Sequence, residues 1–136
     1  MEIKKRILVV DDEPGIGKML RIKLSLEGYD VSTTTSGAEA IELVKERPPD
    51  IMLLDVLMPD VTGMDVVDSV RTFSQVPIII FTARPEIAKF ALKLGANDYI
   101  AKPFDPDLLL GKIRLLLSTC QCVKGSDANK EENPSR

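Results

Sequence analysis

The sequence predicts an α/β fold in which a doubly wound, five-stranded parallel sheet is flanked by five helices. Short apolar runs alternate five times with segments of helical pattern, and the links between them are short. Most of the runs are continuously apolar, which is typical of parallel strands covered on both faces. With 136 residues, 44% of them hydrophobic and 29% charged, the chain suits a single globular domain.

The predicted strands are short, and four of the five are mainly apolar. The second contains Val31 followed by Ser-Thr-Thr, and this polar character suits the edge of a sheet, where a strand meets solvent. In chain order, the strands are predicted at Arg6–Val10, Asp30–Thr33, Asp50–Leu54, Pro77–Phe81 and Asp98–Ala101.

Residues that favour helix ends lie between these strands. Pro14 suits a first helical turn, and Gly28 is expected to end that helix. Ser36 and Glu39 have the spacing of a capping box, and Pro48, followed by a second proline, ends the helix that they begin. The remaining helices are predicted at Thr62–Phe73, at Glu86–Leu94 and from Asp105-Pro106 to about Leu117.

The predicted domain covers residues 1–117, and residues 118–136 are predicted to be a polar C-terminal tail. From Lys124 onward the chain has almost no apolar side chains, a composition that predicts a disordered tail. Cys120 and Cys122 are too close in sequence for an unstrained disulfide bridge. They are expected to be free thiols, with an intermolecular or redox role as the alternative.

Composition also limits the classes of function. The net charge of −3 gives no basis for a nucleic-acid-binding surface over the whole domain. No apolar stretch is long enough to span a membrane and the first residues are no signal peptide, so a cytoplasmic protein without a membrane partner is expected. The chain has no histidine, which excludes histidine-dependent catalytic triads and zinc sites of the usual histidine type.

Polar residues follow the predicted strands at their carboxyl ends. Asp11 and Asp12 follow the first strand, Asp55 the third, Thr82 the fourth and Lys102 the fifth. In a doubly wound sheet the carboxyl ends of all strands lie along one edge, so these residues are expected to converge. Three carboxylates in a small space oppose joint ionisation unless a cation neutralises them. A hard divalent cation such as Mg²⁺ is the simplest neutraliser, and its commonest work among carboxylates is to handle phosphate.

Several short segments at or near these strand ends form a recognisable set. They are Asp11-Asp12, Asp55-Val-Leu-Met58-Pro59, Gly63, Thr82-Ala83, Gly95-Ala-Asn-Asp-Tyr99 and Lys102-Pro103-Phe104. In this order they resemble the receiver domain of two-component response regulators, over about residues 5 to 117. The resemblance implies a flavodoxin-like receiver fold with strand order 2-1-3-4-5, similar to that of the chemotaxis regulators.

The resemblance also implies a phosphoacceptor role for Asp55. This residue would take a phosphoryl group from a phosphohistidine on a sensor histidine kinase or a histidine phosphotransfer protein. Asp12 and Asp55 would bind Mg²⁺, or Mn²⁺ in its place, with the backbone carbonyl of Leu57 as a third protein ligand. Asp11 would act through a metal-bound water.

Further roles follow from the same resemblance. Lys102 would pair with Asp55 and later with a phosphoryl oxygen, while Thr82 would hydrogen-bond another phosphoryl oxygen. Tyr99 would turn inward once Thr82 moves, so that these two residues form the switch. The Lys102–Pro103 peptide bond is expected to be cis. The implied function is a signalling switch and not an enzyme, since the domain would catalyse only its own phosphorylation and dephosphorylation.

The output is expected to pass through protein contacts. No DNA-binding module follows the predicted domain, so the chain is interpreted as a stand-alone receiver without a nucleic-acid partner, either a chemotaxis-type regulator or a phosphorelay intermediate. An excised receiver of a hybrid kinase or larger regulator is the alternative.

The last helix has two apolar faces. Leu109, Ile113, Leu116 and Leu117 form a stripe suited to the core, and Leu108 and Leu115 lie on another face. The second face is interpreted either as a broad buried contact or as an exposed surface for a homodimer or a downstream protein. Such a surface would belong to the fourth-helix to fifth-helix face.

Two features depart from the family pattern. Gly95 follows Thr82 by 13 positions, fewer than the pattern has, so a short fourth helix or entry loop and atypical partner contacts are expected. Leu57 and Arg84 each lie two residues after a site residue and flank the path by which water would reach a phosphoryl group. An apolar Leu57 predicts slow dephosphorylation, because it would exclude that water.

Three other functions compete with this interpretation. A phosphatase of the haloacid dehalogenase type needs a second aspartate two residues after its nucleophile, and Leu57 stands there. A flavodoxin-like electron carrier needs a phosphate-cradling loop after the first strand, where Asp11, Asp12 and Glu13 would repel phosphate. A degenerate receiver that binds partners without phosphorylation is disfavoured by the complete set of polar residues.

Overall fold

The predicted architecture is confirmed, because five parallel strands form one sheet in the order β2-β1-β3-β4-β5. The structure is a computed structural model and describes residues 4–58 and 60–126. The strands are β1 (Arg6–Val10), β2 (Asp30–Thr34), β3 (Ile51–Asp55), β4 (Ile78–Thr82) and β5 (Asp98–Ala101). The helices are α1 (Pro14–Leu26), α2 (Gly37–Glu46), α3 (Gly63–Val70), α4 (Pro85–Leu94) and α5 (Pro106–Ser126).

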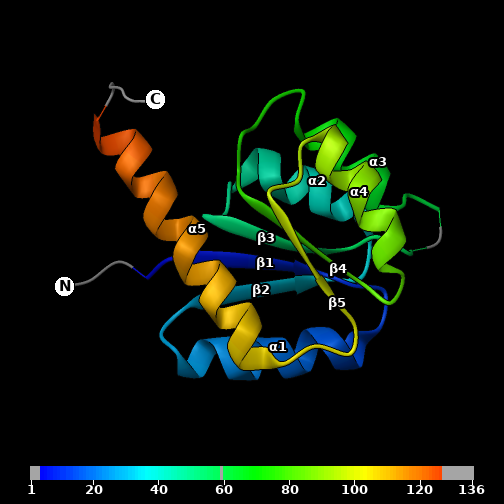
Figure 1. The fold of residues 1–136 in the computed structure, drawn as a ribbon, viewed down its shortest axis with the longest axis horizontal. Helices are drawn as coiled ribbons and strands as arrows, with labels where there is room; N and C mark the ends of the chain where they lie inside the picture. Colours follow the sequence, from blue (N-terminus) through cyan, green and yellow to red (C-terminus); the bar gives the residue numbers. More distant parts are fainter. Residues whose placement is uncertain (1–3, 59, 127–136) are drawn as a thin grey trace.

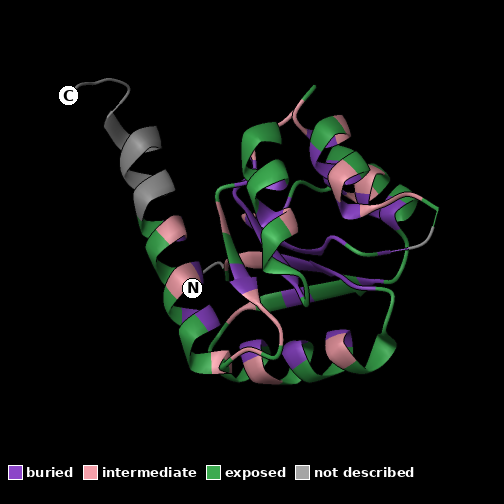
Figure 2. Cartoon of the chain, turned by 45° about the vertical axis from the view of Figure 1, so that its right-hand side comes forward, coloured by how far each residue is buried: buried purple, intermediate pink, exposed green. Residues whose placement is uncertain are grey.

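Helices cover both faces of the sheet, with α1 and α5 on one face and α2, α3 and α4 on the other (Figure 1). Each face has its own apolar core, one around Leu20 and Leu109 and the other around Val44 and Val66. β3 and β4 are buried along their whole length, whereas β2 exposes three of its five residues (Figure 2). The polar β2 therefore occupies the sheet edge, as its sequence predicts.

The start of α2 is capped by Ser36 but lacks the reciprocal capping box that the Ser36–Glu39 spacing predicts. Ser36 does cap α2, since its Oγ accepts a hydrogen bond from the backbone N–H of Glu39 at 3.1 Å. The Glu39 carboxylate, however, accepts from the Thr34 hydroxyl, and Thr34 Oγ1 accepts from the Ser36 N–H at 3.2 Å. A reciprocal capping box is present instead between Thr62 and Asp65 at the start of α3.

The end of α3 lies earlier than predicted. Helical periodicity continues to Phe73, but the regular helix ends at Val70. The N–H groups of Thr72 and Phe73 bond to carbonyls three residues back, at 3.1 and 3.0 Å, which tightens the chain into a turn. The Thr72 hydroxyl also donates to the Ser69 carbonyl at 2.7 Å, a local bond that competes with helix continuation.

The last helix is longer than predicted, ending at Ser126 and not near Leu117. No proline interrupts this stretch, and each residue added to an existing helix gains a backbone hydrogen bond. The first part of the predicted tail is therefore helical, while residues 127–136 and the side chains of Cys120 and Cys122 lie outside the described part.

The two faces of α5 differ in burial. Leu109, Ile113 and Leu117 are buried, as predicted for the core stripe. Leu108 and Leu115 are 57% and 66% exposed, which fits the exposed surface and not the broad buried contact.

Gly63 begins α3 at a point where the backbone leaves almost no room for a side chain. A Cβ atom there would lie 2.4 Å from the Asp55 carbonyl oxygen and 2.5 Å from the Val56 Cα. Both neighbours are main-chain atoms, so a larger residue would displace the link between β3 and α3 that carries Asp55.

We expect Gly63→Ala to lower the free energy of unfolding by about 1–3 kcal/mol, because the added methyl group overpacks the backbone. Gly111→Ala is the matched control, since a Cβ atom at Gly111 would meet nothing within 4 Å. In the interior of α5 this control should stabilise the protein by up to about 1 kcal/mol. Urea unfolding of both variants checks the pair, and a Gly63→Ala protein as stable as wild type would contradict the argument.

Candidate functional site

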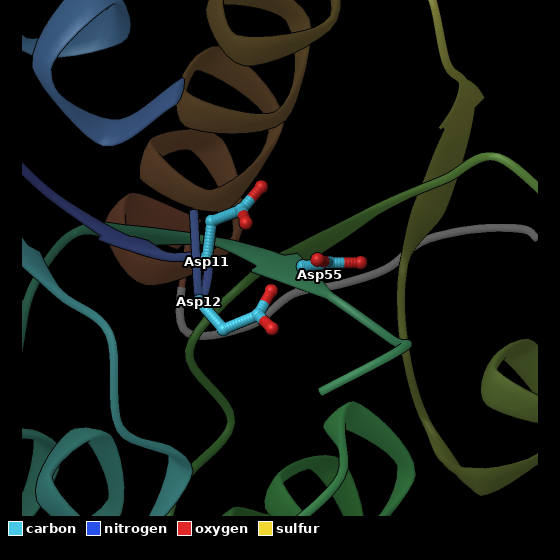
Figure 3. Close-up of side chains that lie close together, drawn as sticks. All are labelled: Asp11, Asp12 and Asp55. Carbon is cyan, nitrogen blue, oxygen red and sulfur yellow. The ribbon is translucent and has the colours of Figure 1, made fainter. Parts of the chain in front are cut away.

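Parallel register brings Asp11 and Asp55 to the same level of the sheet. β1 pairs with β3 so that Val10 lies opposite Leu54, and an aspartate follows each of them. Asp12 comes next, in the link to α1. Figure 3 shows the three carboxylates extending into one space from these neighbouring strand ends. The acidic residues therefore converge as predicted.

The carboxylate cluster suits a divalent cation. Asp11, Asp12 and Asp55 each offer an oxygen within 4.8 Å of the others. Asp11 and Asp55 are 2% and 4% exposed, while Asp12 is exposed, so the cluster opens to solvent on one side. Oxygen ligands with access to water are what Mg²⁺ and Mn²⁺ prefer. The donor set therefore fits the cation that the sequence predicts.

Leu57 contributes to the site through its backbone. Its N–H donates to Asp55 Oδ1 at 3.1 Å and so orients that carboxylate. Its side chain is 44% exposed on the loop that follows β3. The role of its backbone carbonyl as a metal ligand stays a prediction.

Lys102 brings positive charge to the carboxylates. Its Nζ lies 3.0 Å from Asp11 Oδ2 and 3.4 Å from Asp55 Oδ2, so it pairs with both, although sequence reasoning paired it with Asp55 alone. Burial lowers the pKa of Lys102, but the hydrogen bonds and charges of the two aspartates outweigh this effect and raise it. The peptide bond from Lys102 to Pro103 is cis, as expected.

Asp55 lies in surroundings that disfavour its ionised form. Burial and the neighbouring charge of Asp11 raise its pKa to about 6. Lys102 and the Leu57 N–H act in the opposite direction and compensate only in part. The carboxylate is thus destabilised until further positive charge arrives.

Thr82 and Tyr99 differ in exposure. Thr82 ends β4 fully buried, and its Oγ1 accepts a hydrogen bond from the Arg84 N–H at 3.0 Å. Its carbonyl accepts from the Lys102 N–H at 2.8 Å, which connects the ends of β4 and β5. Tyr99 is 39% exposed in this structure. The inward turn expected of Tyr99 when Thr82 moves stays a prediction.

Sequence reasoning missed a contact made by Phe81, which it treated only as the last residue of a strand. Lys102 Nζ lies 5.0 Å from the centroid of the Phe81 ring. Phe104 packs against the same ring edge to face, with centroids 5.9 Å apart. No pattern along the chain indicates this contact, because it depends on the pairing of β3 with β4, which sets Phe81 beside Asp55.

Comparison with known proteins identifies the family. Residues 7–114 match the family described as response regulator receiver domain. The chain belongs to this family. The receiver domain is 42% identical over 110 residues to the transcriptional regulatory protein KdpE of Mycobacterium tuberculosis, a match covering 79% of the chain and 49% of KdpE. It is 41% identical over 117 residues to the DNA-binding response regulator MtrA of Mycolicibacterium smegmatis, which covers 85% of the chain and 51% of MtrA.

Solved receiver structures share the fold. A CheY-like receiver domain protein from Methanospirillum hungatei matches with a TM-score of 0.80 and 31% identity, covering 86% of the chain and 96% of that protein. The BeF3-activated N-terminal receiver domain of RstA from Klebsiella pneumoniae matches with a TM-score of 0.79 and 32% identity, covering 83% and 98%. The family predicted from the sequence is confirmed.

The receiver domain spans about half the length of the curated relatives that it matches. The activity and partners of the whole protein are therefore matters for proposal. Within residues 4–58 and 60–126, no helix has both the length and the apolar character that crossing a membrane requires.

We expect Asp55→Asn to stabilise the receiver at pH 8 in the absence of divalent cations. The pKa of Asp55 is about 6 when folded, against 3.8 as its ordinary value, so the folded state binds this proton more tightly. Stability therefore falls as pH rises through that interval, by roughly 2–3 kcal/mol, and an uncharged asparagine avoids the loss.

Unfolding of both proteins in urea with a metal chelator, at pH 8 and at pH 4, measures this effect. The variant should be more stable at pH 8, and most of the difference should vanish at pH 4, where Asp55 is protonated. A difference of equal size at both pH values would show that charge at Asp55 is not its cause.

Proposed function

We propose that this receiver is a phosphorylation-dependent switch of a two-component system, in which Asp55 accepts a phosphoryl group from a partner phosphohistidine. The observation that carries the proposal is a cluster of three carboxylates at the carboxyl edge of the sheet, two of which, Asp11 and Asp55, pair with Lys102. A cluster of buried like charges is costly to fold, and such arrangements concentrate at functional sites. Membership of the receiver family supplies the chemistry that would use it.

In the proposed step, an oxygen of the Asp55 carboxylate bonds to phosphorus while the phosphorus–nitrogen bond of the phosphohistidine breaks. The electron pair of that bond stays on the imidazole nitrogen, and Asp55 becomes an acyl phosphate. The chain has no histidine, so the donor belongs to a sensor histidine kinase or a histidine phosphotransfer protein. In-line placement and charge neutralisation at the phosphoryl oxygens are the requirements of such a transfer.

Residues of the site match these requirements. The Leu57 N–H orients the nucleophile, and Lys102 Nζ, 3.4 Å from Asp55 Oδ2, is close enough to pair with a phosphoryl oxygen. The Thr82 hydroxyl, which accepts from Arg84, can still donate its own hydrogen to another such oxygen. Mg²⁺ held by Asp12, Asp55 and the Leu57 carbonyl, and by Asp11 through water, would neutralise phosphoryl charge.

The output is proposed to reach a protein partner through the face formed by α4, β5 and α5. This face carries exposed apolar side chains, namely Phe90, Leu94, Tyr99, Leu108 and Leu115. Tyr99 lies on it, so a turn of this residue would alter the surface that a partner or a second copy meets. KdpE and MtrA are named as a transcriptional and a DNA-binding regulator, and the same face would serve a receiver within a larger regulator as well as one acting alone.

We expect one phosphoryl group to be added to the wild-type protein by acetyl phosphate, and only when Mg²⁺ is present. Intact mass measured with and without Mg²⁺, on wild type and on Asp55→Asn, tests this. The variant should gain no mass. An adduct that persists in Asp55→Asn, or no adduct in wild type that demonstrably binds Mg²⁺, would contradict the proposal.

Loss of the phosphoryl group is expected to be slow, and faster in Leu57→Asn. An apolar side chain next to the acyl phosphate excludes attacking water, so a polar one should speed hydrolysis by roughly two- to tenfold. Arg84, on the other side, is engaged by Glu86, with Nε and Oε2 3.0 Å apart. Decay of the phosphorylated form measured by mass spectrometry checks this, with Leu57→Met as the apolar control. Equal decay in all three proteins would remove the role given to Leu57.

A further inference from the structure

Lys102 has an uncharged partner besides its two aspartates. Its Nζ stands over the Phe81 ring, 5.0 Å from the centroid. A cation within about 6 Å of an aromatic face is attracted by the negative charge of that face. The contact is thus of the cation–π type, at the centre of the phosphorylation site.

The core of the domain fixes this ring in place. Phe81 is fully buried and belongs to the apolar core on the α1 and α5 face. Phe104 packs on it at an interplanar angle of 72°, and the strand register flanks it with Asp55 on β3 and Ile100 on β5. A ring held on several sides presents its face at a constant position, whereas a lysine side chain alone has several rotatable bonds.

The ring differs from the aspartates in what phosphorylation would do to it. Asp55 exchanges its carboxylate for an acyl phosphate, and Asp11 shares its charge with any cation in the cluster. The Phe81 ring carries no charge and takes no part in these exchanges. It is therefore a contact of Lys102 that persists while the charged partners change.

We propose that Phe81 is a positioning residue, whose ring face holds the Lys102 ammonium beside Asp55 during phosphoryl transfer. This inference rests on the proposed phosphorylation of Asp55 and deepens it. It predicts that the rate of transfer depends on the electron density of the ring and not only on its volume. An aliphatic side chain at this position fills the core but offers the ammonium no negative face.

Fluorinated phenylalanines at position 81 test this, because they weaken the aromatic face while nearly keeping the shape. The rate of Asp55 phosphorylation by acetyl phosphate should fall stepwise from phenylalanine through 4-fluoro- and 3,4,5-trifluoro- to pentafluorophenylalanine. The total loss should be about three- to tenfold. Phe81→Tyr should keep most of the rate, and Phe81→Leu should lose it to a similar extent as the pentafluoro protein. Urea unfolding shows that each protein compared is folded.

Two controls separate positioning from a structural effect. The same series at Phe73, which is 41% exposed beyond the end of α3 and lies under Lys45 Nζ at 5.4 Å, should leave the rate unchanged. In a Lys102→Met background, fluorination at position 81 should have no further effect, because the cation is gone. A flat series at Phe81 with Lys102 intact, or an equal fall in the Lys102→Met background, would overturn the inference. If the unfluorinated protein takes no phosphoryl group at Asp55, the proposed function fails, and the inference with it.

Discussion

The charge balance at the carboxyl edge of the sheet constrains the rest of this receiver. Asp11 and Asp55 are buried side by side, and Lys102 is shared between them at 3.0 and 3.4 Å. Burial and the charge of Asp11 raise the pKa of Asp55 to about 6, because Lys102 compensates for them only in part. Any change of charge here, from a cation or a phosphoryl group, alters the free energy of the surrounding strand ends. The site is therefore coupled to the fold through electrostatics.

Rigid packing limits which parts of the domain can move when the charge at the site changes. β3 and β4 are buried throughout, and the close approach of Gly63 to the Asp55 carbonyl ties the following loop to the strand. Away from the site, the Arg71 guanidinium donates to the carbonyls of Gly95 and Ser74 and to the Asn97 side chain, which ties the end of α3 to the link between α4 and β5. The more exposed groups, such as Tyr99 and the outer faces of α4 and α5, are less constrained by packing.

Much of this organisation could be predicted from sequence because it depends on local patterns. Continuous apolar runs gave the strands, and parallel topology then implied that Asp11, Asp12 and Asp55 converge. The extent of α5 was missed, since a composition typical of disorder can still continue an existing helix. The sharing of Lys102 with Asp11 and its contact with the Phe81 ring depend on side-chain packing across strands, which no spacing along the chain encodes.

The most direct test of the proposed site is to identify which aspartate carries the phosphoryl group. The receiver would be treated with acetyl phosphate and Mg²⁺ and then with borohydride, which reduces an acyl phosphate to the alcohol, and mapped by peptide mass spectrometry. Phosphorylation of Asp55 predicts homoserine at position 55 and unmodified aspartate at positions 11 and 12. Homoserine at either of the latter two, in place of position 55, would contradict the assignment of nucleophile and metal ligands.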